Sequence, residues 1–321
     1  MKFLDWTLPT PEQNLAADEA LLDWCEAREA SEVLRFWSSA QPFVVVGYAN
    51  DVATEVNLAA CAARGVPVLR RCTGGGTVLQ GPGCLNYALV LRITRDGPTR
   101  NISVTNQFVM GRNCVALQSA IGDVQGSAAS LHLAGRSPSP RPSPPGRGSS
   151  LGSAGKGTPF GISSQRGVCC LPLPGGEGRG EGEHEFRLAR HGLVSVRGHT
   201  DLALDGVKFS GNAQRRKRRC LLFHGTILLN LNLALVEELL PMPSRQPEYR
   251  QNRPHRDFIR NLPLSADTVK HALAGAWSAE QADVPGLDEA IETLISAKYG
   301  RRDWNLKRSE LGSTSAASGL L

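Results

Sequence analysis

The chain has 321 residues, of which 41% are hydrophobic and 21% are charged, and its formal net charge is +6. This length suits one large domain or two ordinary ones and is sufficient to bury a hydrophobic core. There is no apolar run of the roughly 18 residues that a membrane-spanning helix needs, and the N-terminus lacks the apolar stretch of a signal peptide. We therefore expect a cytoplasmic protein without a membrane span.

The first predicted element is a helix near the N-terminus. Thr10 is suited to the N-cap, a proline follows at the first helical position, and Gln13 completes a capping box. Apolar residues at helical spacing continue to about Arg28. Further elements alternate up to the middle of the chain: strands at 33–37, 43–47, 67–70 and 86–93, and helices at 55–64 and 103–121.

Residues 134–185 differ in composition from the rest of the chain. These 52 residues include 8 prolines and 13 glycines and few large apolar side chains. Such a segment buries too little apolar surface to offset its chain entropy. We expect a disordered insertion in a surface loop, which the host domain tolerates because loop-closure cost grows slowly with length. A proline-rich docking site is the functional alternative.

Strand and helix patterns resume after this segment. We expect strands at 191–196, 202–204, 207–210 and 220–230, helices at 233–240, 266–274 and 287–299, and a flexible tail at 306–321. Helices at both ends of a run of mostly antiparallel strands predict an α+β domain formed by residues 1–133 and 186–305.

Eight cysteines are spread along the chain without a Cys-x-x-Cys pair. Their spacing indicates neither a zinc site nor a disulfide framework, so we expect reduced thiols. The positive charge is concentrated in five consecutive cations at 215–219. This run is typical of a solvated face, and its functional alternative is attraction to an acidic partner or to nucleotide phosphates.

A glycine-rich loop follows the strand that ends near residue 70. Two arginines lead into three consecutive glycines, and glycine lets backbone N–H groups approach a phosphate or carboxylate closely. The arginines add forked donors for the same anion. A tight strand-to-strand turn is the structural alternative. The candidate binding residues are Arg70, Arg71, Thr73, Gly74, Gly75, Gly76, Thr77, Val78 and Leu79.

A second segment, far along the chain, contains a lysine in an apolar strand context. Lys208 is followed by Ser210 and Gly211, which with it are further candidate substrate- or ATP-binding residues, and is preceded by Asp201. Because lysine is rarely buried without a partner, a strand lysine beside a glycine points to a functional role. An edge-strand lysine that prevents aggregation is the alternative. Asp201 is a weaker candidate for a Mg²⁺ ligand, and a turn residue is its structural alternative.

Together the two segments resemble the lipoate–protein ligase A family. The resemblance rests on Arg-Arg-x-Thr-Gly-Gly-Gly-x-Val, then Asp-Leu, Lys-Phe-Ser-Gly-x-Ala-Gln and His-Gly-Thr-x-Leu, in this order. It implies a biotin/lipoyl ligase-like (class II synthetase-like) fold, with a mixed, mainly antiparallel sheet flanked by helices. The lysine motif fits the lipoate branch of the family better than the biotin branch.

The resemblance implies a reaction in two steps. ATP, with Mg²⁺, would activate lipoate or octanoate as an acyl-adenylate, and the acyl group would pass to a lysine of a lipoyl carrier domain. The catalytic residue would be Lys208, bridging the α-phosphate and the acyl carbonyl. The expected acceptors are 2-oxoacid dehydrogenase acyltransferase subunits and the glycine cleavage H protein.

The chain departs from the family pattern at several places. Gln80-Gly81 stands where many relatives have His-Asp, and Cys84 stands where asparagine is common. The C-terminal domain of the full-length ligases is not recognisable after about Asn305. The resemblance therefore leaves open weak ATP-dependent activation, or a separate accessory chain.

Three other interpretations remain open. An octanoyl or lipoyl transferase on the same fold works without ATP but needs a nucleophilic cysteine. Cys169 and Cys170 lie in the predicted insertion, and Cys72 and Cys84 suit packing better. A basic nucleic-acid-binding protein would use residues 215–219, but few aromatic residues flank them, and this partner is not expected. The third interpretation is a ligase that the insertion has made defective.

Overall fold

The computed structural model describes residues 1–28, 32–134 and 192–307, without the side chains of 125–134. Residues 1–128 and 192–307 form one compact unit. The predicted insertion lies outside the described residues apart from Ala134, and so does the predicted tail from residue 308 onward. Within the described residues, no helix is both long and apolar enough to cross a membrane.

The elements follow one another in chain order. They are β1 (Lys2–Asp5), α1 (Pro11–Ala27), β2 (Val33–Trp37), β3 (Phe43–Val46), α2 (Val52–Glu55), α3 (Leu58–Ala63), β4 (Val68–Arg70), β5 (Val78–Gln80), β6 (Cys84–Arg92), α4 (Ile102–Ala134), β7 (Val194–Arg197), β8 (Asp201–Leu204), β9 (Val207–Arg216), β10 (Cys220–Leu228), α5 (Leu233–Leu239), the 3₁₀ helix η1 (Glu248–Arg250), α6 (His255–Phe258), α7 (Ala266–Ala276), β11 (Glu280–Gln281), α8 (Asp288–Leu294), the π-helical turn η2 (Ile295–Tyr299) and α9 (Arg302–Asn305).

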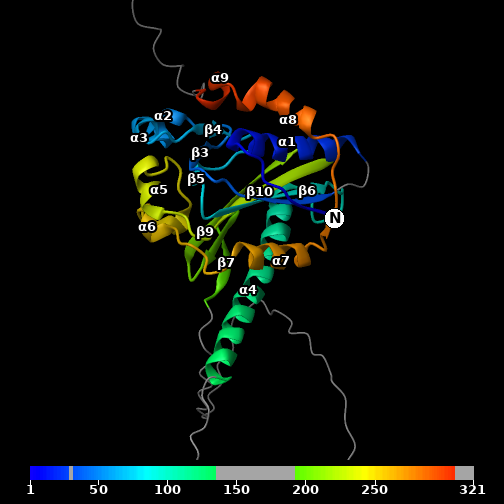
Figure 1. Cartoon of the computed structure of the whole chain (residues 1–321), viewed down its shortest axis with the longest axis vertical. Helices are drawn as coiled ribbons and strands as arrows, with labels where there is room; N and C mark the ends of the chain where they lie inside the picture. The colour runs from blue at the N-terminus through cyan, green and yellow to red at the C-terminus, as the bar shows by residue number, and fades with distance from the viewer. Residues whose placement is uncertain (29–31, 135–191, 308–321) are drawn as a thin grey trace, which may run out of the picture. The chain divides into compact units, whose positions relative to one another are not determined.

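The described strands form two sheets (Figure 1). The larger has the order β11-β1-β2-β6-β10-β9-β8-β7, and the smaller has the order β4-β3-β5. In the larger sheet β1 pairs in parallel with β2 and β11, whereas the other pairs are antiparallel. The prediction of an α+β domain with a mixed, mainly antiparallel sheet is confirmed.

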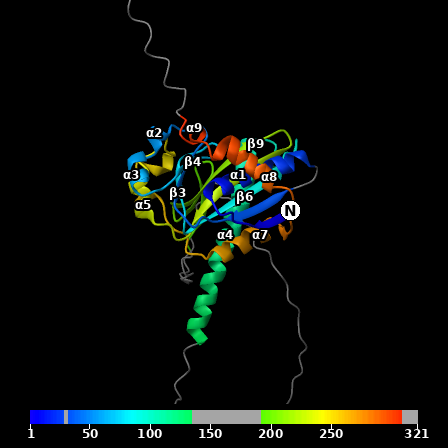
Figure 2. The same cartoon turned by 45° about the horizontal axis from the view of Figure 1, so that its top comes forward.

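Side-chain alternation along β6 builds a core on each face of the larger sheet. Leu85 and Leu89 belong to the core that α4 and α7 complete, and Ala88 and Val90 belong to the core beneath α1 and α8. Successive strand residues point to opposite faces, so a fully apolar strand is buried on both sides. Figure 2 shows α1 and α8 on one face of the sheet and α7 on the other.

A third core cluster lies at the smaller sheet. Val44 and Val46 of β3 pack there with apolar residues of α2, α3 and α5. This cluster holds β5, and with it the end of the glycine loop, beside the larger sheet. The arrangement therefore places residues 73–80 next to β9 and β10.

Several predicted elements differ from the structure in their bounds. The α1 capping box is confirmed, because Gln13 N donates to Thr10 Oγ1 and Thr10 N donates to Gln13 Oε1. The single helix expected at 55–64 is two short helices, since Asn57 caps α3. The helix expected to end at residue 121 continues to Ala134, although residues 122–134 include two glycines and two serines, which have low helix propensity. The strand expected at 207–210 continues to Arg216, because residues 210–216 pair with β10.

Candidate active site

A cavity of about 550 Å³ lies between the glycine loop, strands β6, β9 and β10, and the segment 240–259. Its volume is in the range of small-molecule sites. The residues that line it include Trp37, Val45, Arg71, Gly75, Gly76, Thr77, Val78, Leu79, Gln80, Asn86, Asp201, Lys208, Ser210, Gly211, His224 and Thr226. The glycine loop and the lysine segment therefore meet at one site, although more than 120 residues separate them in the sequence.

The Arg71 side chain holds the glycine loop from within. Its Nε and Nη2 donate to the Gly74 carbonyl at 3.1 and 2.7 Å, and Nη2 also donates to the Gly76 carbonyl at 2.7 Å. Burial lowers the pKa of Arg71 to about 10. Arg71 lines the cavity, and it orients the loop backbone so that a ligand meets a preformed surface.

The backbone of Gly47 closely approaches this loop. A methyl group added at Gly47 would lie 2.1 Å from the Gly75 carbonyl oxygen. We expect Gly47→Ala to displace the loop and to lower kcat/KM of the enzyme about 100-fold, since small misplacements of binding groups have effects of this size. Gly111→Ala is the matched control, because a methyl group there contacts nothing within 4 Å. Equal activity of the two variants would show that the loop position is not critical.

Arg70 has a different environment from its neighbour. Its side chain is fully buried and does not line the cavity. The guanidinium donates to five backbone carbonyls, those of Gly47, Tyr48, Asn50, Trp304 and Lys307. The sequence prediction that Arg70 binds a ligand anion is therefore not supported: its donors connect β4 to the 47–50 turn, to α9 and to Lys307 after it.

Lys208 forms an ion pair at the cavity wall. Its Nζ lies 2.8 Å from Asp201 Oδ1, and Tyr249 donates its hydroxyl to Asp201 Oδ2 at 2.7 Å. Burial and the Asp201 carboxylate raise the pKa of Tyr249, so this hydroxyl keeps its proton. Because an ammonium has three donors and Asp201 takes one, Lys208 retains donors for a ligand.

This pairing also bears on the predicted metal role of Asp201. Both carboxylate oxygens have protein partners, and among the described residues no group of three or more His, Cys, Asp or Glu side chains could hold a metal ion. The structure thus places Asp201 as the partner of Lys208. Tyr249 was missed because it comes from a proline-rich loop whose pattern says nothing about its neighbours in space.

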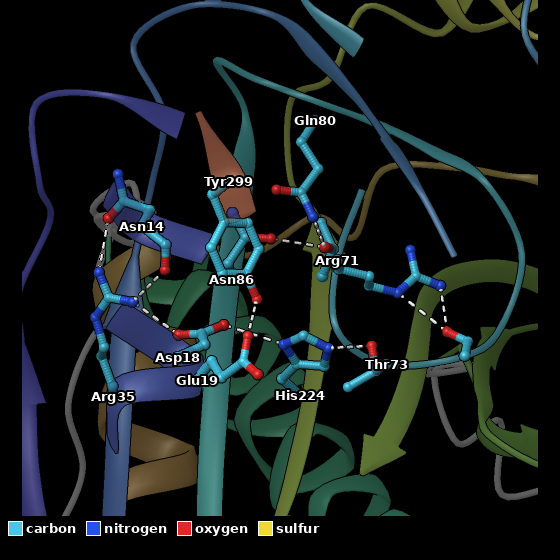
Figure 3. Close-up of polar contacts among 12 residues, drawn as sticks. Asn14, Asp18, Glu19, Arg35, Arg71, Thr73, Gln80, Asn86, His224 and Tyr299 are labelled. Atoms are coloured by element: carbon cyan, nitrogen blue, oxygen red, sulfur yellow. Dashed lines mark hydrogen bonds and ion pairs between the residues drawn. The ribbon is translucent and has the colours of Figure 1, made fainter. Parts of the chain in front are cut away.

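A buried polar network supports the base of the loop (Figure 3). His224 Nδ1 lies 3.0 Å from Asp18 Oδ2, and His224 Nε2 lies 2.7 Å from Thr73 Oγ1. Asp18 also pairs with the fully buried Arg35 at 2.7 Å. The network ties the glycine loop to α1 and to β10. Thr73 belongs to this network, and the Gly74 carbonyl accepts from Arg71; neither residue lines the cavity.

The basic run at 215–219 packs against an acidic face of α1. Arg215 pairs with Glu19 at 2.8 Å, Lys217 pairs with Asp23, and Glu26 accepts from the backbone N–H groups of Arg219 and Cys220. Carboxylates at 19, 23 and 26 share one helix face. These contacts favour a structural role for the run over nucleic-acid binding.

The cysteines of the described residues lie outside the cavity lining. Burial raises the pKa of Cys72 to about 11 and that of Cys84 to about 12. A nucleophilic cysteine needs a lowered pKa and access to its substrate. Cys169 and Cys170 lie outside the described residues.

Comparisons with known proteins agree with this geometry. The sequence profile of the lipoyl protein ligase A/B catalytic domain matches residues 10–112 and 187–276. The chain is 23% identical to the octanoyltransferase LipM of Brevibacillus brevis, over 93% of this chain and 96% of that protein.

Solved structures show the same fold. A bi-partite lipoate protein ligase from Thermoplasma acidophilum superimposes with a TM-score of 0.60 at 18% identity, covering 97% of this chain and 98% of that one. A lipoate-protein ligase A bound with ATP gives 0.58 at 20% identity, covering 95% and 98%. The predicted ligase-like fold is confirmed. Because the family profile matches more than half of its residues, the chain belongs to the lipoyl protein ligase A/B catalytic-domain family.

Proposed function

We propose that this protein attaches a lipoyl or octanoyl group to a lysine of a lipoyl carrier domain, with ATP as the activating substrate. The observation that carries the proposal is the cavity shared by Lys208 and the Gly75–Leu79 segment, which no cysteine of the described residues lines. A site with a fixed cation and bare backbone amides suits phosphate chemistry better than thiol chemistry.

In the first step the acyl carboxylate attacks the α-phosphate of ATP. A bond forms between the carboxylate oxygen and phosphorus, and the bond to pyrophosphate breaks, which gives the acyl-adenylate. Negative charge builds up on the α-phosphate oxygens in this step. The Lys208 ammonium would stabilise that charge, and Asp201 with Tyr249 would hold the ammonium in place.

In the second step the neutral amine of the carrier lysine attacks the acyl carbon. The amide forms, AMP leaves, and the amine loses a proton. Lys208 would again stabilise the phosphate of the leaving group. The acceptors that we propose are lipoyl domains of 2-oxoacid dehydrogenase acyltransferase subunits and the glycine cleavage H protein.

Mg²⁺ would reach the site with ATP. The described residues offer no cluster of ligands for a metal of their own. In nucleotide sites Mg²⁺ is commonly held by phosphate oxygens, water and one or two carboxylates.

An octanoyltransferase is the second candidate, because the Brevibacillus brevis relative bears that name and its match covers nearly the whole length of both chains. Such a reaction would move octanoyl from a carrier thioester to the lipoyl domain. Either a cysteine thiolate of the enzyme first accepts the octanoyl group, or the acceptor lysine attacks the thioester directly. Within the described residues, the cysteines near the glycine loop have raised pKa values.

One experiment distinguishes the two functions. The pure full-length chain is incubated with an apo lipoyl domain and either octanoate with ATP and Mg²⁺, or an octanoyl-carrier thioester without ATP. The mass of the lipoyl domain is then measured. We expect the octanoyl mass increase with octanoate and ATP. An increase with the thioester alone would establish the transferase, and no increase in either reaction would refute both functions.

A further inference from the structure

A continuous chain of hydrogen bonds connects the helices α7 and α4 to a turn that lines the cavity. Trp277 Nε1 of α7 donates to Asn113 Oδ1 of α4 at 2.8 Å, and Asn113 Nδ2 donates to the Tyr87 hydroxyl of β6 at 3.0 Å. The Tyr87 hydroxyl donates to Asn212 Oδ1 of β9 at 2.6 Å, and Asn212 Nδ2 donates to the Thr200 carbonyl at 2.7 Å. The chain thus ends at the turn between β7 and β8, which belongs to the cavity lining.

The two ends give this hydrogen-bond chain a single direction. The Trp277 indole N–H can only donate, so the Asn113 amide must present its carbonyl oxygen to it. The Thr200 carbonyl can only accept, so the Asn212 amide must present its NH₂ group there. The Tyr87 hydroxyl between the two amides therefore accepts from one and donates to the other. Burial raises the pKa of Tyr87, so this hydroxyl keeps its proton.

Gly225 makes the central hydrogen bond possible. It lies on β10 between its cross-strand partners Tyr87 and Asn212, one on each neighbouring strand. A methyl group added at Gly225 would lie 1.7 Å from Asn212 Oδ1. The Asn212 amide thus occupies the space over a bare residue and reaches Tyr87 across β10. The glycine of the His-Gly-Thr segment is therefore required for the chain to be continuous.

The last hydrogen bonds of the chain hold the peptide group that leads into Asp201. Thr200 Oγ1 donates to the Asn212 carbonyl at 2.8 Å, so Asn212 holds Thr200 through its backbone as well as its side chain. The pairing of β8 with β9 shifts register between the positions of Asp201 and Lys208, and such a bulge interrupts the regular ladder. Because the ladder alone does not set their separation, the 2.8 Å ion pair of Asp201 with Lys208 depends on how Asn212 holds this turn.

We propose that Asn212 is a positioning residue for Lys208 and that the chain starting at Trp277 sets the orientation of its amide. Asn212 holds the turn before Asp201, and the Asp201 carboxylate holds the Lys208 ammonium. This inference rests on the proposed function, which gives Lys208 its catalytic role, and it extends the support of that role to α4 and α7. A small displacement of a preorganised cation lowers the rate of the chemical step more than it weakens substrate binding.

The test compares Tyr87→Phe and Trp277→Phe with the unaltered full-length chain. Acyl transfer from octanoate and ATP to an apo lipoyl domain gives kcat and KM, and mass spectrometry follows hydrogen exchange of the backbone amides in residues 198–204. We expect Tyr87→Phe to lower kcat roughly 10-fold, to change both KM values less than about twofold, and to speed exchange in this segment. Trp277→Phe should act in the same direction but less strongly, because the Asn113 carbonyl can then turn toward Tyr87 and compete for its proton.

Trp24→Phe is the matched control. It also removes an indole, but Trp24 Nε1 has no hydrogen-bond partner among the described residues, and Trp24 does not line the cavity. This variant should keep kcat and the exchange of residues 198–204 unchanged. The double variant Tyr87→Phe with Trp277→Phe should lose no more activity than Tyr87→Phe alone, because the first change already breaks the chain.

Three results would overturn the positioning role. They are an unchanged kcat in Tyr87→Phe that thermal unfolding shows to be folded, a loss that appears in KM alone, and losses that multiply in the double variant. The exchange measurement needs no substrate. Inactivity of the unaltered chain in the mass experiment would therefore refute the proposed function, whereas unchanged exchange of residues 198–204 in Tyr87→Phe would refute the role of the hydrogen-bond chain.

Discussion

Replacing Lys208 with alanine is expected to abolish most adenylate formation while the fold is retained. Lys208 supplies the cation that lies beside Asp201 at the cavity wall. Loss of one preorganised donor of this kind typically costs about 100- to 1000-fold in rate. The measurement is pyrophosphate release with octanoate and ATP, together with thermal unfolding to confirm the folded state.

Lys217→Ala is the control for this experiment. Lys217 pairs with Asp23 of α1 and does not line the cavity, so its loss should change pyrophosphate release by only a few fold. If Lys208→Ala also stayed within a few fold of the unaltered protein, the role assigned to Lys208 would be wrong. If both variants lost activity equally, a general effect of positive charge would explain the result better than a local one.

Arg70→Ala is expected to cause the largest loss of stability among the variants considered. The change removes a buried guanidinium and leaves five backbone carbonyls without its hydrogen bonds. Each buried acceptor left unsatisfied costs about 1–3 kcal/mol, and water entering the space offsets part of this. We expect the free energy of unfolding to fall by at least about 3 kcal/mol in urea denaturation.

Arg64→Ala provides the comparison, since Arg64 pairs with Glu238 at the surface, where such pairs contribute about 0–1 kcal/mol. A ligand-binding role for Arg70 predicts the opposite pattern from the one expected here: near-normal stability and a raised KM for ATP. That outcome would restore the sequence-based assignment of Arg70 to the anion site and would require the turn at 47–50 to be held by other contacts.

The local patterns predicted most elements because each depends on residues close together in the chain. The Thr10 capping box and the alternation along β6 are of this kind. Errors arose where long-range pairing decides the bounds, as in β9, which continues through Arg215 and Arg216 because β10 pairs with it. The short strands β1 and β11 were missed for the same reason: they exist through their pairing with each other and with β2.

In the candidate site, too, local patterns predicted some features and long-range packing decided the others. Arg70 and Arg71 are chemically identical neighbours, and nothing in the sequence distinguishes them. Because strand residues alternate between faces, one guanidinium orders the glycine loop at the cavity and the other is buried beneath the 47–50 turn. Likewise, a lysine motif in sequence does not reveal that Tyr249 and Asp201 hold its ammonium.

Local sequence patterns were enough to predict the α+β class, the family and the two segments that meet at the cavity, because glycine spacing and a strand lysine are signals carried by a few neighbouring residues. Tertiary structure alone decided which donors remain free for a ligand. Gln80 and Thr226, which are 146 positions apart, share a hydrogen bond only because two sheets meet at the cavity. Buried polar groups take their partners from whichever strands pack beside them, and that packing is set by the whole chain.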